Sequence, residues 1–178
     1  MTKKDLRYQK TNELLQITLI DLLQTQTFEK ITVNDLCQQS LIGRSTFYHH
    51  YDDKYELLNQ MITDLSQKFQ ELINRRNTQL NDDSLLIYLY KELFDQRQTF
   101  LTLLDLKSTT NDLATQIQQI LKNASLDLIE KLPSNLPIDF LTDIYAINAL
   151  TAITWTLKNG YSKEVAAFMN DSLKKLIL

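Results

Sequence analysis

The sequence is poor in glycine, proline and cysteine: it has two glycines, two prolines and one cysteine among 178 residues. Sheets joined by tight turns need glycine and proline, so their scarcity favours an all-α fold. One cysteine excludes an intramolecular disulfide framework and is typical of a reducing compartment. The first residues are polar and indicate no signal peptide, and no run of about 18 apolar residues could span a membrane. These absences together predict a cytoplasmic, all-helical protein.

Strong positive charge is also missing, since the net charge is −3 and the pI is 5.4. A protein that coats nucleic acid would be basic throughout, so any DNA binding must depend on a local patch and on geometry. A small basic cluster, Lys3, Lys4, Arg7 and Lys10, lies near the N-terminus. It could be an arm that contacts phosphate groups, or it could be ordinary solubilising charge.

Residues 31–58 carry the most informative pattern. Thr32 is a good helix N-cap, and Asp35 follows it three residues later, which is close to a capping box. The next apolar residues fall on one helical face with i, i+3, i+4 spacing: Val33, Leu36 and Cys37. Cys37 is therefore interpreted as a small buried side chain and not as a redox sensor or metal ligand.

A second short helix is predicted from Arg44 to about His50, after a break at residues 41–43. Its first turn carries Arg44, Ser45 and Thr46, and its apolar face is formed by Phe47 and Tyr51. A helix, a three- to four-residue turn and a second short helix are the parts of a helix-turn-helix. In that motif the N-terminal residues of the second helix contact base edges in the major groove.

The sequence shows no pattern typical of an enzyme or a metal protein. His49 and His50 are adjacent, so on a helix they point about 100° apart and cannot easily share a metal ion. We find no carboxylate pair, no nucleophile beside a base, no glycine-rich phosphate loop and no ligand cluster. We therefore expect neither catalysis nor a cofactor.

Residues 28–36 and 44–58 resemble the DNA-binding domain of the TetR/AcrR family of bacterial regulators. The specific part is the run Thr-Phe-Tyr-x-His-aromatic-x-x-Lys-x-x-Leu-Leu, residues 46–58. The family usually has glycine where this chain has Leu41, a small hydroxyl residue where it has Gly43, and often glycine where it has Thr27. We interpret these departures as local changes in turn geometry.

The resemblance implies a function and a set of contact residues. It implies a sequence-specific transcriptional regulator that binds a near-palindromic operator as a homodimer, most members being repressors released by a small molecule. His50 would pack under the recognition helix. The predicted base contacts come from Arg44, Ser45, Thr46 and His49, and the predicted phosphate contacts come from Thr32, Tyr48 and Lys54.

The rest of the chain is helical by its apolar periodicity. We predict a DNA-binding domain over residues 1–60 and an effector-binding and dimerisation domain over residues 61–178, with about nine helices in all. Besides the two short helices above, the expected helices cover residues 4–25, 53–76, 85–94, 100–106, 112–132, 138–159 and 162–177.

The last two helices are the candidate self-association surface. Residues 138–159 form the most apolar helix, and alanines recur within it every three residues, which would let another helix approach closely. A monomer could instead bury both helices internally. In the resembled family these two helices form a four-helix dimer interface.

Aromatic residues in the second half are candidates for lining an effector pocket, although such residues at helical spacing are more often core. They are Tyr88, Phe94, Phe100, Tyr145 and Trp155. An alternative is control by a partner protein, because the sequences of residues 28–32 and 46–58 are similar to those of activators of dihydroxyacetone kinase operons. An exposed apolar patch, with no cavity in the second domain, would favour that alternative.

Overall fold

The computed structural model describes residues 3–77, 85–106, 112–131 and 133–175, and within these ranges all regular structure is helical. The predicted all-α fold and the count of about nine helices are confirmed for the described residues. The elements are α1 Lys3–Leu23, α2 Val33–Ser40, α3 Arg44–His50, α4 Lys54–Asn77, α5 Leu85–Leu93, the 3-10 turn η1 Phe94–Gln96, α6 Arg97–Asp105, α7 Leu113–Ile129, α8 Ile138–Asn159 and α9 Lys163–Lys175.

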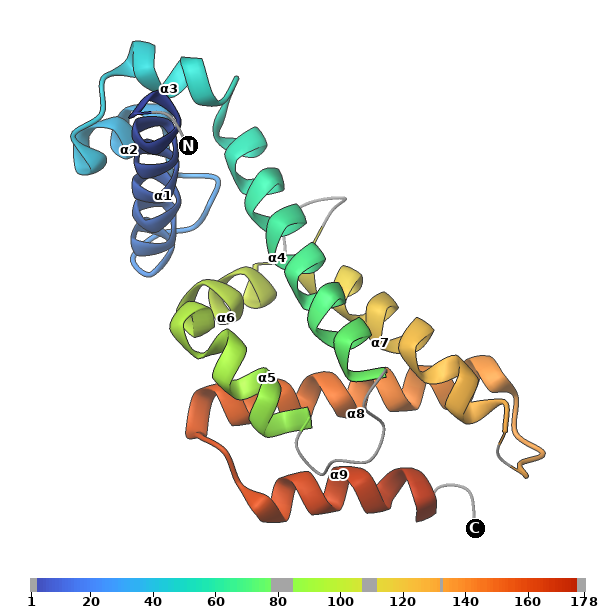
Figure 1. Ribbon diagram of the computed structural model, residues 1–178. Helices are drawn as coiled ribbons and strands as arrows, with labels where there is room; N and C mark the ends of the chain where they lie inside the picture. Colours follow the sequence, from blue (N-terminus) through green and yellow to red (C-terminus); the bar gives the residue numbers. More distant parts are fainter. Residues whose placement is uncertain (1–2, 78–84, 107–111, 132, 176–178) are drawn as a thin grey trace.

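Helices α1, α2 and α3 form a small head at one end of the molecule (Figure 1). The apolar stripe of α1 is buried, as its leucine spacing predicts, and α1 packs against α2 and α6. Phe28, in the loop between α1 and α2, is 1% exposed and closes this core. The other fully buried side chains of the head are Leu15, Leu19, Ile31, Leu36 and Phe47.

Helix α4 runs from the head into the rest of the molecule, here called the body (Figure 1). Its apolar stripe is buried along its length, from Leu57 and Leu58 beside the head to Phe69 and Leu72 beside α7. The expected boundary at residue 60 therefore lies inside a helix. Head and body share one continuous hydrophobic core.

The body packs α7 against α4 and α8, while α5 and α9 also contact α8. The alanine spacing of α8 serves this packing, because Ala146, Ala149 and Ala152 are all buried toward its neighbours. Helix α9 crosses below α8 after Gly160, whose φ of +94° is a conformation that suits glycine. Residues 176–177 of the expected last helix lie outside the described residues.

Helix α6 begins three residues earlier than its apolar pattern predicted. The 3-10 turn at Phe94–Gln96 leads directly into it. Arg97 stabilises the junction, since its guanidinium lies 4.0 Å from the centre of the Phe94 ring and donates a 2.9 Å hydrogen bond to the Phe94 carbonyl. No helix in the described part of the chain combines the length and the hydropathy needed to cross a membrane.

Candidate DNA-binding site

The N-terminus of α2 is fixed by a capping box. The Thr32 hydroxyl oxygen accepts from the Asp35 amide at 3.1 Å, and the Asp35 carboxylate accepts from the Thr32 amide at 2.8 Å. The Thr32 hydroxyl also donates to that carboxylate at 2.7 Å. These hydrogen bonds, first from the Thr32 side chain and then from its backbone, lower the pKa of Asp35. The predicted cap is confirmed, and Thr32 is exposed beside it.

The turn of the helix-turn-helix contains a leucine in the left-handed conformation. Leu41 has a φ of 56° and a ψ of 30°, and its side chain is 92% exposed. The amide of Ile42 donates to the carbonyl of Cys37 at 3.1 Å, which closes the end of α2. Leu41 thus occupies the turn position where the TetR/AcrR family usually has glycine. It adopts the left-handed backbone conformation that favours glycine.

Helix α3 presents a polar face to solvent. Phe47 is fully buried beneath it, whereas Arg44, Ser45, Thr46, Tyr48 and His49 are all exposed. The Tyr48 side chain lies one helical turn from Arg44, and its interaction with the guanidinium raises the pKa of Arg44. Five of the seven predicted DNA contacts therefore lie together on one short, exposed helix.

The N-terminal half of α1 lies beside that polar face. A cavity of about 500 Å³ separates the two helices and is lined by Arg7, Tyr8, Thr11, Ser45, Thr46, His49 and His50. The rings of Tyr8 and His50 stack at 4.0 Å with 17° between their planes. Burial, followed by the neighbouring His49, lowers the pKa of His50. His50 packs under α3 and His49 faces outward, in keeping with the resemblance.

Sequence reasoning missed Tyr8 and Thr11. It identified only the basic residues near the N-terminus, although the spacing of Tyr8 and Thr11 places them on neighbouring positions of one helical face. The i, i+4 spacing from Arg7 could have indicated Thr11, whereas Tyr8 points about 100° away from Arg7 on the helix. Their proximity to α3, however, depends on how α1 packs.

Lys54, a predicted phosphate contact, has its ammonium group bonded to the protein. Its Nζ donates to the carbonyls of Phe28, Glu29 and Ile31 at 2.8, 3.1 and 2.7 Å. The same nitrogen lies 4.7 Å from the centre of the Phe28 ring. Three donors and three acceptors leave no free N–H on the ammonium in this conformation. Lys54 here ties the loop before α2 to the first turn of α4.

Two further contacts hold the head together. The Tyr51 hydroxyl donates to the Asn12 side chain, which links the end of α3 to α1. Asp53 caps α4 by accepting from the amides of Tyr55 and Glu56, each at 2.8 Å. The C-terminal end of α3 is therefore anchored to α1.

The five aromatic candidates for an effector site differ in their exposure. Phe100 is fully buried, Tyr88 and Tyr145 are half-buried, Phe94 stacks on Arg97, and Trp155 is exposed on the outer face of α8. None of them lines the cavities described for this structure. No group of three or more potential metal ligands is present among the described residues.

No family model matches the chain. An uncharacterised HTH-type transcriptional regulator of Bacillus subtilis, YxbF, is 44% identical over 59 residues, which are 33% of this chain and 16% of that protein. The negative regulator IcaR of the Staphylococcus epidermidis biofilm operon is 22% identical over 152 residues, 82% of each protein. The dhaKLM operon activator DhaS of Lactococcus lactis is 30% identical over 90 residues, 51% of this chain and 46% of the activator.

Solved structures agree with the architecture described above. A TetR transcriptional regulator from Streptococcus agalactiae superposes with a TM-score of 0.67, at 24% identity, over 96% of this chain and 97% of that one. The sequence relatives are transcriptional regulators and not enzymes. The chain therefore has the fold of the TetR-type transcriptional regulators, with its helix-turn-helix in residues 33–50.

Proposed function

We propose that the protein is a homodimeric transcriptional regulator that binds a near-palindromic operator through the exposed face of α3. The observation that carries this proposal is the gathering of Arg44, Ser45, Thr46 and His49 on that face, over a buried Phe47. Hydroxyls, a guanidinium and an imidazole at the start of a recognition helix can hydrogen-bond to base edges. Residues 1–60 serve as the DNA-binding domain, and residues 61–178 carry dimerisation and effector control.

Contacts to phosphate hold the head in register on the duplex. Thr32 and Tyr48 are exposed hydroxyls on α2 and α3, and both suit phosphate oxygens. Lys54 belongs to this set only if its ammonium leaves the three carbonyls when DNA binds. In the free protein, its part is to place α2 and α3 relative to α4.

Dimerisation uses the outer face of α8 together with α9. Large apolar side chains stand at helical spacing on that face, opposite the buried alanines: Phe140 is 51% exposed, Ile147 is 52% exposed and Trp155 is 42% exposed. Phe168 on α9 is also exposed. Large apolar side chains exposed on one helical face are typical of protein interfaces. Helices 138–159 and 162–177 thereby form the proposed homodimer interface.

Effector control acts on the spacing of the two heads in the dimer. An effector that favours one spacing shifts the population toward or away from the form that binds the operator. Repression released by a small molecule is the proposed direction, in line with the negative regulator among the relatives.

A second candidate function is control by a partner protein. The head exposes large apolar side chains that its own core does not use: Leu6, Leu14, Ile17 and Leu41. One relative is an operon activator. This candidate predicts that DNA binding responds to a co-expressed protein and not to any small molecule.

Selection of genomic fragments by the purified protein, followed by fluorescence anisotropy on the enriched site, tests the main proposal. We expect a short palindrome bound by two protomers, with affinity that falls steeply as salt rises. Tyr48→Phe should weaken binding about equally on all sequences because it removes one phosphate contact. Tyr55→Phe, which removes a hydroxyl on α4, is the matched control. No enriched sequence at moderate salt would contradict the proposal.

A further inference from the structure

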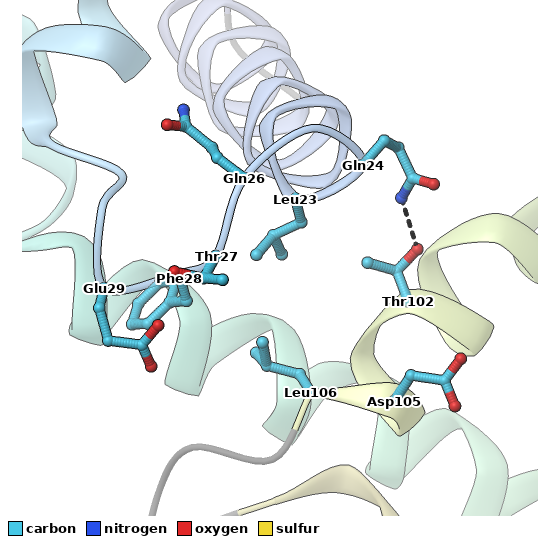
Figure 2. Close-up of a pocket in the computed structure, with 9 residues that line it drawn as sticks. All are labelled: Leu23, Gln24, Gln26, Thr27, Phe28, Glu29, Thr102, Asp105 and Leu106. Carbon is cyan, nitrogen blue, oxygen red and sulfur yellow. Dashed lines mark hydrogen bonds between the residues drawn. The ribbon is translucent and has the colours of Figure 1, made fainter.

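A cavity of about 570 Å³ lies where the head meets the body (Figure 2). One wall is the end of α1 and the loop that follows it, residues 23–29, and the other wall is the end of α6. It is separate from the DNA-facing cleft between α1 and α3. Its volume falls within the range of small-molecule sites in proteins.

The cavity has an apolar interior and a polar edge. Leu23 and Leu106 point toward each other across it, with the Phe28 ring nearby (Figure 2). On one side, the Gln24 amide nitrogen donates to the Thr102 hydroxyl at 2.9 Å, and this bond joins α1 to α6. Such a lining suits a ligand with an apolar body and a polar end.

Among the residues that the structure describes, the charged side chains that line the cavity are both acidic, Glu29 and Asp105. The Lys54 ammonium is bonded to backbone carbonyls, two of which belong to the lining residues Phe28 and Glu29. Hydrogen bonds from its own backbone amide and from Thr27, with a smaller effect of Lys54, lower the pKa of Glu29. Glu29 is therefore anionic at neutral pH, so the lining favours a cation over an anion.

The loop wall of the cavity continues directly into the helix-turn-helix. Residues 27–29 lead to Thr32, the N-cap of α2, and Lys54 ties the carbonyls of residues 28, 29 and 31 to the first residue of α4. The opposite wall belongs to the body. A ligand that contacts both walls would therefore affect the position of α2 and α3 relative to α6.

We infer that this cavity binds a small organic cation with an apolar body, whose ammonium group lies near Glu29 on the loop wall, and that its occupancy changes operator affinity. The binding site stands on the geometry of the cavity alone. The regulatory consequence rests on the proposed DNA-binding function.

Isothermal titration calorimetry on the full chain, with hexylamine, octylamine and decylamine as probes, tests the site. Octanol and octanoate are the neutral and anionic matches of octylamine. We expect octylamine to bind more tightly than octanol, and octanoate to bind most weakly. Equal affinity for the three, or no binding of any amine, would overturn the inference.

Charge-removing variants locate the ammonium group. Glu29→Gln should weaken octylamine binding by roughly three- to tenfold, as expected for an exposed charge pair. Asp105→Asn, on the opposite wall, should have a smaller effect. Asp21→Asn removes an exposed carboxylate on α1 that does not line the cavity, so it should change nothing. Unchanged octylamine affinity in both cavity variants would place the amine elsewhere.

Operator binding is measured separately, by anisotropy with and without octylamine. A change of affinity in wild type that is lost in Glu29→Gln supports the regulatory consequence. If octylamine saturates the protein and operator affinity does not change, the regulatory consequence is overturned, but the binding site still stands. Failure to bind any DNA would overturn the proposed function. Calorimetry would still show whether octylamine binds the protein.

Discussion

The head and the body differ in how their candidate functional residues are held. In the head, the residues expected to contact DNA lie within 23 positions of one another, from Thr32 to Lys54, on three consecutive elements. Caps and side-chain hydrogen bonds fix their backbone. In the body, the five aromatic candidates come from four separate elements and end in different environments, some buried and one on the outer face of α8.

This difference shows what local spacing can encode. A cap three residues from its partner, or a hydroxyl on the first turn of a helix, is positioned by geometry that the neighbouring sequence determines. A body pocket depends instead on how distant helices pack, and aromatic residues serve core, interface and pocket equally well. Substitutions in the two regions should therefore have different kinds of effect.

The largest expected effect is in the body. Ile147→Asp places a charge at the centre of the exposed face of α8 and should raise the dimer dissociation constant by roughly a hundredfold. Analytical ultracentrifugation measures it, and operator affinity should fall with the dimer. Ile17→Asp, an equally exposed site on α1, should leave the dimer intact. A dimer that survives Ile147→Asp would contradict the proposed interface.

In the head, the largest effect is expected at Lys54. Lys54→Met removes the hydrogen bonds to three carbonyls and should lower the free energy of unfolding by about 2 kcal/mol. Chemical denaturation measures it, with the exposed Lys30→Met as control. If Lys54 also binds a phosphate in the complex, the salt dependence of DNA binding falls by about one unit of slope. An unchanged slope would mean that Lys54 positions α2 and α3 relative to α4 and makes no phosphate contact.

Arg44 and Tyr48 should behave as a coupled pair. Arg44→Ala should cost ~1–3 kcal/mol on the operator and relax the preference at one base position. Because the Arg44 and Tyr48 side chains interact one helical turn apart, the double variant should lose less than the sum of the single losses. A double-mutant cycle by anisotropy measures this coupling. Strict additivity, or wild-type discrimination in Arg44→Ala, would count against the assignment.

A smaller and opposite effect is expected at Leu41. Leu41→Gly relieves a left-handed backbone but makes the unfolded chain more flexible, so stability should rise by only about 0.5 kcal/mol. Thermal unfolding measures it. Leu41→Ala keeps the β-carbon and should show no such gain. Destabilisation by Leu41→Gly would mean that the exposed side chain contributes to the fold.

The smallest effect is the pH dependence at Asp35. Its pKa is lowered in the folded protein, so its contribution to stability is present above the unfolded pKa of ~3.9 and is lost as pH falls through the folded value. Asp35→Asn should therefore be less stable than wild type at neutral pH and approach it under acid conditions. Denaturation curves across pH 2–7 measure the difference. A difference that persists at the acid end would contradict this origin.

Much of the head could be predicted from the sequence. The capping box at Thr32, the start of α3 at Arg44 and the burial of Phe47 all follow from local patterns. The carbonyl contacts of Lys54 could not, because they join residues more than 20 positions apart through the packing of a loop on α4. The cavity at the end of α6 could not be predicted for the same reason. Neither residues 23–29 nor residues 102–106 carry a sequence pattern that indicates a binding site.

The continuity of α4 has a mechanical consequence. Its 24 residues span about 36 Å at ~1.5 Å per residue, without a break between head and body. A tilt of only about 5° at one end therefore displaces the other by about 3 Å, close to the rise of one base pair along B-DNA. Under the proposed function, a displacement in the body smaller than one side chain would therefore be enough to shift α3 by about one base-pair step on the operator.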